Sequence, residues 1–147
     1  MHHRTLDQIT QVATVQPATN LSWKAIRRQR LHRLADLLSA YTGPIRLLTR
    51  IEYLPSAERQ TLRGDFSPLA LAYQDAEFRR AGLAGDTLGD AMAFFDLSDH
   101  QSHTLFCDCH YGYSVEAPMI AARIRTVANR LSFRERWQNV RAFLFSR

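Results

Sequence analysis

The sequence predicts an all-α protein, a single domain built as an irregular bundle of roughly six to eight short helices. Three observations predict this class. Apolar residues recur at spacings of three and four along most of the chain, which is the period of an α-helix. Serine residues stand where these segments would begin, and glycine or proline where several of them would end. The length of 147 residues suits one domain, and no linker marks a boundary.

The first 20 residues differ from the rest of the chain. Residues 1–20 are rich in Gln, Thr and Ala, and Pro17 interrupts any long helix. We expect a flexible arm there, or one short helix over residues 5–14, followed by a single helical domain over residues 21–147. No signal peptide is recognisable, and no segment approaches the ~18 apolar residues of a spanning helix. The sequence therefore predicts a soluble, non-exported protein that does not contact a membrane.

Residues 23–41 form the clearest helical pattern. Ser22 can cap this helix, and Thr42-Gly43-Pro44 ends it. One apolar stripe runs along it, made by Leu31, Leu34, Leu38 and Tyr41. Arg27 and Arg30 lie on the same side as this stripe, and arginines are not buried without partners. Either the first turns project beyond the core, or both arginines meet acids from the middle of the chain.

The middle of the chain predicts a series of short helices. Residues 45–54 fit a helix, although their β-branched and aromatic residues also permit a short strand, and we favour the helix. A helical turn follows from Ser56 to Gly64. Ser67-Pro68 opens a helix that runs to about Ala81, and Gly85-Asp86 supplies the cap for a helix over residues 87–95.

The last third predicts three more helices. Ser98 and Gln101 form a capping box for a helix that reaches about Cys109. Ser114 caps residues 115–130, and a second capping box from Ser132 opens a final helix. Residues 91–106 superficially resemble a DNA-binding helix-turn-helix, but the second helix carries no Lys or Arg. The segment is better interpreted as an αα-hairpin.

Charge is distributed in three blocks. Residues 1–64 carry a net charge of +6, residues 65–116 carry −7, and residues 117–147 carry +6. The simpler interpretation is that the basic ends pack against the acidic middle. The alternative is a basic face on the first helix that binds an acidic protein or a nucleic acid. The candidate binding residues are Lys24, Arg27, Arg28, Arg30 and Arg33.

The strongest local feature is a concentration of His and Cys. His100, His103, Cys107 and His110 are spaced three, four and three apart, which places them on one face of a continuous helix. Leu105, Phe106 and Cys109 would then face the core. The candidate metal ligands are His103, Cys107, Cys109 and His110, which suit zinc or another transition metal. Ten helical residues span about 15 Å, so further ligands must come from elsewhere.

The same residues offer a possible nucleophile. His103 and Cys107 lie one helical turn apart, within reach of a thiol–imidazole hydrogen bond. Reactive cysteines usually sit at a helix N-terminus or beside positive charge, whereas Cys107 lies near a C-terminus beside Asp108. The two cysteines, one residue apart, form no disulfide framework, and free thiols are typical of the cytosol.

No complete catalytic constellation is visible in the sequence. We therefore predict a cytoplasmic, non-enzymatic binding or accessory protein that acts through a protein partner and needs no cofactor. The first alternative is a metal- or thiol-dependent site at His103, Cys107, Cys109 and His110. The second is nucleic-acid binding through the basic helix at residues 23–33. The oligomeric state is left open.

Overall fold

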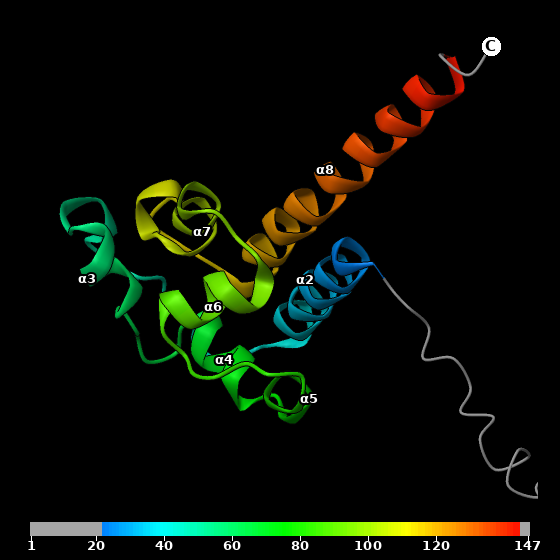
Figure 1. Ribbon diagram of the computed structural model, residues 1–147. Helices are drawn as coiled ribbons and strands as arrows, with labels where there is room; N and C mark the ends of the chain where they lie inside the picture. Colours follow the sequence, from blue (N-terminus) through cyan, green and yellow to red (C-terminus); the bar gives the residue numbers. More distant parts are fainter. Residues whose placement is uncertain (1–21, 145–147) are drawn as a thin grey trace, which may run out of the picture.

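The computed structural model describes the backbone of residues 22–144 and the side chains of residues 22–130. Within these ranges the chain forms seven α-helices, two short 3-10 turns and no strand, which confirms the all-α class (Figure 1). The predicted arm over residues 1–20, with its optional helix over 5–14, lies outside the described residues. The elements are α2 (Trp23–Ala40), η2 (Ile51–Tyr53), α3 (Ser56–Gln60), α4 (Pro68–Gln74), α5 (Ala76–Arg80), α6 (Leu88–Phe95), α7 (Asp99–Phe106), η3 (Asp108–His110) and α8 (Ala117–Leu144).

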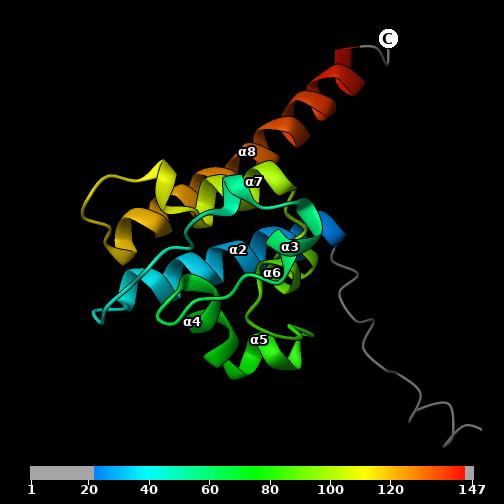
Figure 2. The same ribbon diagram turned by 90° about the vertical axis from the view of Figure 1, so that its left-hand side faces the viewer.

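The two longest helices, α2 and α8, pack side by side and antiparallel (Figures 1 and 2). Their contact is apolar, and the predicted stripe of α2 is buried, apart from the half-buried Tyr41. The fully buried side chains include Leu31, Leu34 and Leu38 of α2 and Ile120 and Ile124 of α8. At 1.5 Å per residue, α8 is about 42 Å long and α2 about 27 Å, so α8 extends beyond its partner.

The short helices α3 to α7 lie together beside this pair (Figure 2). Three aromatic rings join α5 to α6. Phe78, Phe94 and Phe95 meet edge to face, with ring centroids 4.9–5.6 Å apart. This geometry is favoured by the ring quadrupoles. No helix in the described part of the chain has both the length and the apolar character needed to cross a membrane.

The predicted helix over residues 45–54 is wrong. Most of this segment is extended, with only a 3-10 turn at its end. Leu48 forms an isolated parallel bridge with Cys107: its N–H donates to the Phe106 carbonyl at 2.8 Å, and its own carbonyl accepts from Asp108 N–H at 3.0 Å. The segment thus obtains backbone hydrogen bonds from residues distant in sequence, while Leu48 and Ile51 are still buried.

The predicted helix from Pro68 to Ala81 is divided at Asp75. Asp75 is extended, and its carboxylate accepts hydrogen bonds from the N–H groups of Glu77 (2.7 Å) and Phe78 (3.4 Å), so it caps α5. Aspartate side chains compete with the helix for backbone donors in this way. The same carboxylate pairs with both ends of the Arg33 guanidinium fork, with a closest distance of 2.8 Å.

Two further helix boundaries differ from prediction. The cap of α6 is Thr87, which forms a capping box with Asp90, whereas Asp86 pairs with Arg63 at 2.8 Å. The two C-terminal helices are one: α8 begins at Ala117 and continues through Ser132. A capping-box pattern does not interrupt a helix when the residues on both sides favour helix and no Gly or Pro follows Pro118. The predicted caps at Ser22, Ser67 and Ser98 are confirmed.

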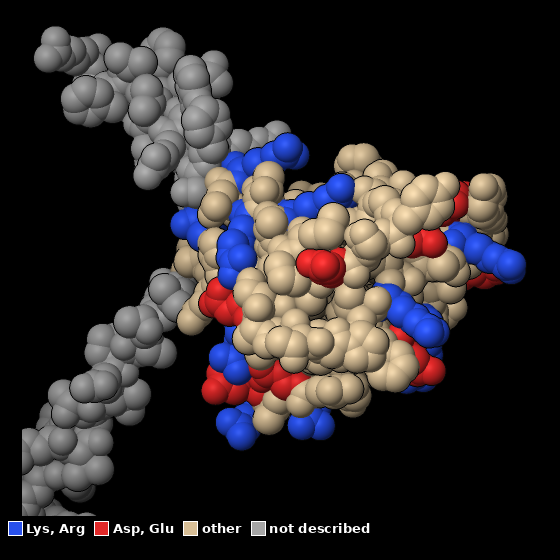
Figure 3. Space-filling view, turned by 180° about the vertical axis from the view of Figure 1, so that it is seen from behind, with Lys and Arg blue, Asp and Glu red and all other residues tan. Residues whose placement is uncertain are grey.

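In the described residues, the basic N-terminal block packs against the acidic middle, whereas Arg125 of the C-terminal block pairs with Asp36 of the N-terminal block at 3.0 Å. Arg27 is buried, and its Nε donates to the carbonyls of Phe95 (3.0 Å) and Asp96 (2.7 Å) at the turn between α6 and α7. The Asp96 carboxylate lies 3.9 Å away. Arg30 donates to the Phe94 carbonyl at 2.8 Å and so meets a backbone dipole instead of an acid. Figure 3 shows Lys and Arg mixed with Asp and Glu on one face of the molecule.

We expect Asp75→Ala to lower the free energy of unfolding by about 1–3 kcal/mol, because it removes a helix cap and a charged hydrogen bond. Burial raises the pKa of Asp75, but hydrogen bonds from Glu77, Arg33 and Phe78 outweigh it, and the net pKa is lowered. The stabilisation is therefore present above the unfolded pKa of about 4 and is lost as pH falls through the lower folded value.

Urea unfolding of both proteins between pH 7 and pH 2 measures this difference. Glu77→Gln is the control, because Glu77 also contacts Arg33 (3.1 Å) but is largely exposed, and its loss should change little. A stability difference that stayed constant down to pH 2 would contradict the role of the ionised carboxylate.

Candidate metal centre

The chain around the cysteines leaves the helix earlier than predicted. α7 ends at Phe106, and Cys107 is extended (φ −89°, ψ 137°), because its neighbours are held by the bridge to Leu48. A 3-10 turn over Asp108–His110 follows. His103 therefore stands in the last turn of α7, and the expected continuous face from His100 to His110 does not form.

The burial of the two thiols is the reverse of the prediction. Cys107 is fully buried, and Cys109, which was expected to face the core, is exposed. Leu105 and Phe106 are buried as predicted. The helical period that would place Cys109 beside them no longer applies once the helix has ended at Phe106.

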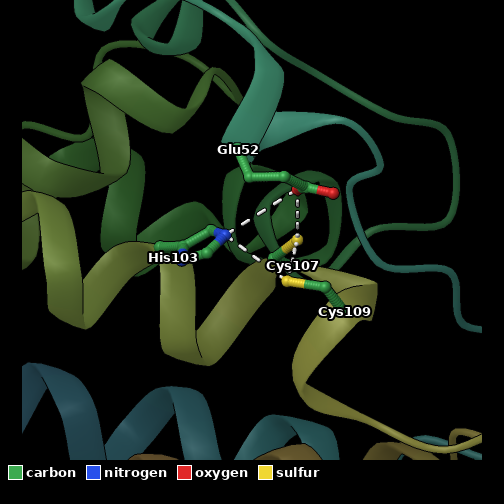
Figure 4. A group of neighbouring side chains, drawn as sticks. All are labelled: Glu52, His103, Cys107 and Cys109. Atoms are coloured by element: carbon green, nitrogen blue, oxygen red, sulfur yellow. Dashed lines mark hydrogen bonds and ion pairs between the residues drawn. The ribbon is translucent and has the colours of Figure 1, made fainter.

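Four ligand-type side chains converge at this point (Figure 4). The donor atoms of Glu52, His103, Cys107 and Cys109 all lie within 4.8 Å of one another. Cys109 Sγ lies 3.4 Å from His103 Nε2 and 2.8 Å from Cys107 Sγ. Glu52 Oε2 lies 3.6 Å from Cys107 Sγ and 3.9 Å from His103 Nε2. The cluster thus joins η2, the end of α7 and the turn after it.

These separations resemble the edges of a tetrahedral coordination shell. Zinc–ligand bonds of about 2.0–2.3 Å place neighbouring ligand atoms about 3.3–3.8 Å apart. The distances from Cys109 Sγ to His103 Nε2 and from Cys107 Sγ to Glu52 Oε2 fall in this range, and the distance from Glu52 to His103 is just beyond it. The two sulfur atoms are 2.8 Å apart, closer than this edge, so they would move apart by about 1 Å around an ion.

Glu52 is the member of the cluster that the sequence did not indicate. It is 55 positions from Cys107, and no local pattern marks it. A hydrogen bond from its own backbone N–H lowers the pKa of Glu52, and the Cys107 thiol and the His103 imidazole add to this, against a smaller effect of burial. The carboxylate is therefore an ionised ligand group at neutral pH. The sequence indicated that the His and Cys residues of one helix could not bind an ion without further ligands from elsewhere in the chain, and Glu52 is such a ligand group.

His110 lies beside the cluster, on the far side of His103. Its Nε2 is 3.1 Å from His103 Nδ1, and the two rings are edge to face at 4.6 Å. Burial lowers the pKa of His110, and electrostatic repulsion from the neighbouring His103, Arg123 and His100 lowers it further, against a smaller opposing effect of Glu52, so its ring is neutral at pH 7. A neutral His110 can accept the His103 Nδ1 proton, which directs the Nε2 lone pair of His103 toward the other three groups.

The predicted nucleophile pair has an unfavourable environment. Burial raises the pKa of the Cys107 thiol, and its hydrogen bond with Cys109 and the charge of Glu52 raise it further, against an opposing backbone hydrogen bond. Cys107 is thus a neutral thiol unless a cation is present. The thiol with a hydrogen-bonding distance to His103 is instead Cys109, at 3.4 Å. His100 is exposed and takes no part in the cluster.

The candidate binding residues of the first helix have different contacts within the protein. Arg27 and Arg30 are engaged by backbone carbonyls, and Arg33 is engaged by the carboxylate of Asp75. Lys24 is exposed in the first turn of α2, and Arg28 is half-buried. Binding of an acidic partner or a nucleic acid through this helix stays a prediction.

Comparison with known proteins identified no relative: no family model, curated protein or solved structure matches the chain.

We expect the two thiols to react very differently with an alkylating reagent in the metal-free protein. Exposed Cys109 should be modified rapidly by iodoacetamide, whereas buried Cys107, whose pKa is raised, should react at least about 100-fold more slowly. Peptide mass spectrometry at timed intervals distinguishes the two sites. Guanidinium-unfolded protein is the control, in which both rates should become similar. Equal rates in the folded protein would contradict the burial of Cys107.

Proposed function

We propose that this protein binds one zinc ion through Glu52, His103, Cys107 and Cys109. The observation that carries this proposal is the convergence of four ligand-type atoms within 4.8 Å from separate parts of the chain. Side chains brought together in this way from η2, α7 and the adjoining turn form a preorganised site.

The ligand types favour zinc over other common metals. Two thiolates and an imidazole are typical zinc ligands, and a carboxylate completes many zinc sites. Magnesium and calcium prefer sites made of oxygen atoms alone, and two sulfur ligands disfavour both. The bound ion would also reverse the electrostatics at Cys107, because a coordinating thiol loses its proton.

Four protein ligands support a structural role for the ion. A catalytic zinc site usually has three protein ligands and an open position, whereas structural sites are filled by the protein. Coordination here would link η2 to the end of α7, closing a loop of more than 50 residues. The bound ion would thus stabilise the surface formed by η2 and the end of α7. Action through a protein partner, which we predict from the sequence, is compatible with that surface and is part of the proposal.

We expect the metal-free protein to bind one equivalent of Co²⁺, used as a spectroscopic substitute for Zn²⁺. Thiolate coordination should give a near-ultraviolet charge-transfer band, and tetrahedral geometry should give intense visible bands. Addition of Zn²⁺ should abolish both. Cys107→Ser and Cys109→Ser should each remove about half of the charge-transfer intensity. His103→Ala and Glu52→Gln should weaken binding by at least about tenfold.

His100→Ala is the matched control, since it removes an exposed imidazole from the same helix without touching the cluster. It should bind Co²⁺ as the unchanged protein does. The proposal is wrong if the unchanged protein shows no charge-transfer band, or if Glu52→Gln and His100→Ala bind equally well.

Metal affinity should depend steeply on pH. Each cysteine binds the ion as a thiolate, so two protons are released at a pH where both thiols are neutral. Because the pKa of Cys107 is raised, this thiol stays neutral to a higher pH, and its proton is still released on metal binding there. Competition with a chelator of known affinity should show Zn²⁺ binding strengthening by up to about 100-fold per pH unit between pH 6 and pH 8. Cys109→Ser should reduce this slope to about tenfold per unit. A pH-independent affinity would contradict thiolate coordination.

A further inference from the structure

A separate cavity lies between the C-terminal end of α2 and α4. Its volume is about 370 Å³, within the range of small-molecule sites. Three aromatic rings and two carboxylates contribute to its walls, and none of the lining residues is Lys, Arg or His. The side chains that supply these rings and charges are Tyr41, Asp65, Phe66, Tyr73 and Asp86.

The aromatic rings are placed by the fold in different ways. The Tyr41 hydroxyl donates to the Pro44 carbonyl at 3.0 Å, which fixes this ring against the turn after α2. Phe66 is 52% exposed and Tyr73 is 37% exposed, although both are large apolar residues. They line the cavity from the turn before α4 and from α4 itself. Phe66 therefore presents apolar surface to the cavity that no core contact covers, whereas the Tyr73 ring also has the Arg79 guanidinium 5.9 Å from its centroid.

Phe66 adopts a backbone conformation that L-residues rarely occupy. Its φ is 60°, in the left-handed region, which is unfavourable for a bulky side chain. The Arg46 N–H donates to its carbonyl at 2.9 Å, and Ser67 caps α4 immediately afterwards. The strained position gains little in burial, because Phe66 remains exposed. What it achieves is to hold an aromatic ring at the cavity wall.

The cavity also has an unbalanced negative charge. Asp86 is paired with Arg63 at 2.8 Å. Asp65 is exposed at the rim, with no ion pair or side-chain hydrogen bond to any residue that the structure describes. One carboxylate is therefore uncompensated in a wall made mainly of aromatic and aliphatic groups. Aromatic faces carry negative potential, which adds to the attraction for a cation.

We propose that this cavity binds a small organic cation with an apolar shell, such as a methylated ammonium group. The aromatic rings can pack against the methyl groups and attract the positive charge, and Asp65 supplies a negative charge to balance it. A hydrated metal ion would gain nothing from the rings, and a neutral apolar ligand would gain nothing from Asp65. The volume exceeds that of the cationic group alone, so it accommodates an attached chain, either of a free metabolite or of a modified side chain.

Titrations followed by two-dimensional amide NMR test this proposal with the full-length protein. Choline is the cationic probe, and 3,3-dimethylbutan-1-ol is its neutral counterpart, with carbon in place of the charged nitrogen. Choline should shift the amide resonances of Phe66 and Tyr73 saturably and bind at least about tenfold more tightly than the alcohol. A blocked trimethyllysine amide forms a third arm, and tighter binding than choline would identify a protein side chain as the source of the cation.

Two variants separate binding from folding. Phe66→Gly removes the ring but suits the left-handed backbone, so it should weaken choline binding at least about tenfold without lowering the melting temperature. Asp65→Asn should weaken binding by about fivefold, and Glu58→Gln, an exposed acid on α3, is the control that should have no effect. Equal binding of choline and the alcohol, or unchanged binding by Phe66→Gly, would overturn the proposal.

Discussion

The isolated bridge between Leu48 and Cys107 determines the geometry on which the candidate metal centre depends. Two backbone hydrogen bonds, of 2.8 and 3.0 Å, hold an extended segment against the residues that come after α7. They end the helix at Phe106, turn the Cys107 thiol inward and bring η2, with Glu52, over the two sulfur atoms. Without the bridge, a continuous helix would spread its His and Cys residues along about 15 Å of one face, too far apart for a single ion.

The parts of the fold that could be predicted are those governed by local chemistry. The stripe of α2 and the caps at Ser22, Ser67 and Ser98 each depend on residues within one or two turns, and these were correct. The caps predicted at Ser114 and Ser132 were wrong, because α8 begins at Ala117 and runs through Ser132. Two other failures have non-local causes. Residues 45–54 are extended because of residues near Cys107, and Asp75 divides a helix with the help of Arg33. The apolar residues of these segments fit the predicted helices as well as the observed structure, so periodicity could not distinguish the two.

The candidate metal centre likewise has a part that depends on local sequence and a part that depends on tertiary contacts. His103, Cys107 and Cys109 could be selected from the sequence because they are close together in it, whereas Glu52 could not, since only the tertiary bridge makes it a neighbour. His110 was chosen for its residue type, and the structure places it against the outer nitrogen of His103. The turn at the end of α7 places His110 behind His103, where it would orient this ligand instead of binding an ion itself. Residue spacing in the sequence does not encode that turn.

The extended segment after α2 also bears on tolerance to insertions and deletions. Arg46 fixes the carbonyl of Phe66, Leu48 fixes the residues flanking Cys107, and Glu52 lies on the same stretch. Because alternate residues of an extended chain face opposite ways, adding or removing one residue here would disturb the aromatic cavity and the thiol cluster together. Gly112 and the fully exposed Tyr113 have no such ties to the rest of the described chain. Length variation is therefore expected to accumulate at Gly112 and to be excluded between Pro44 and Pro55.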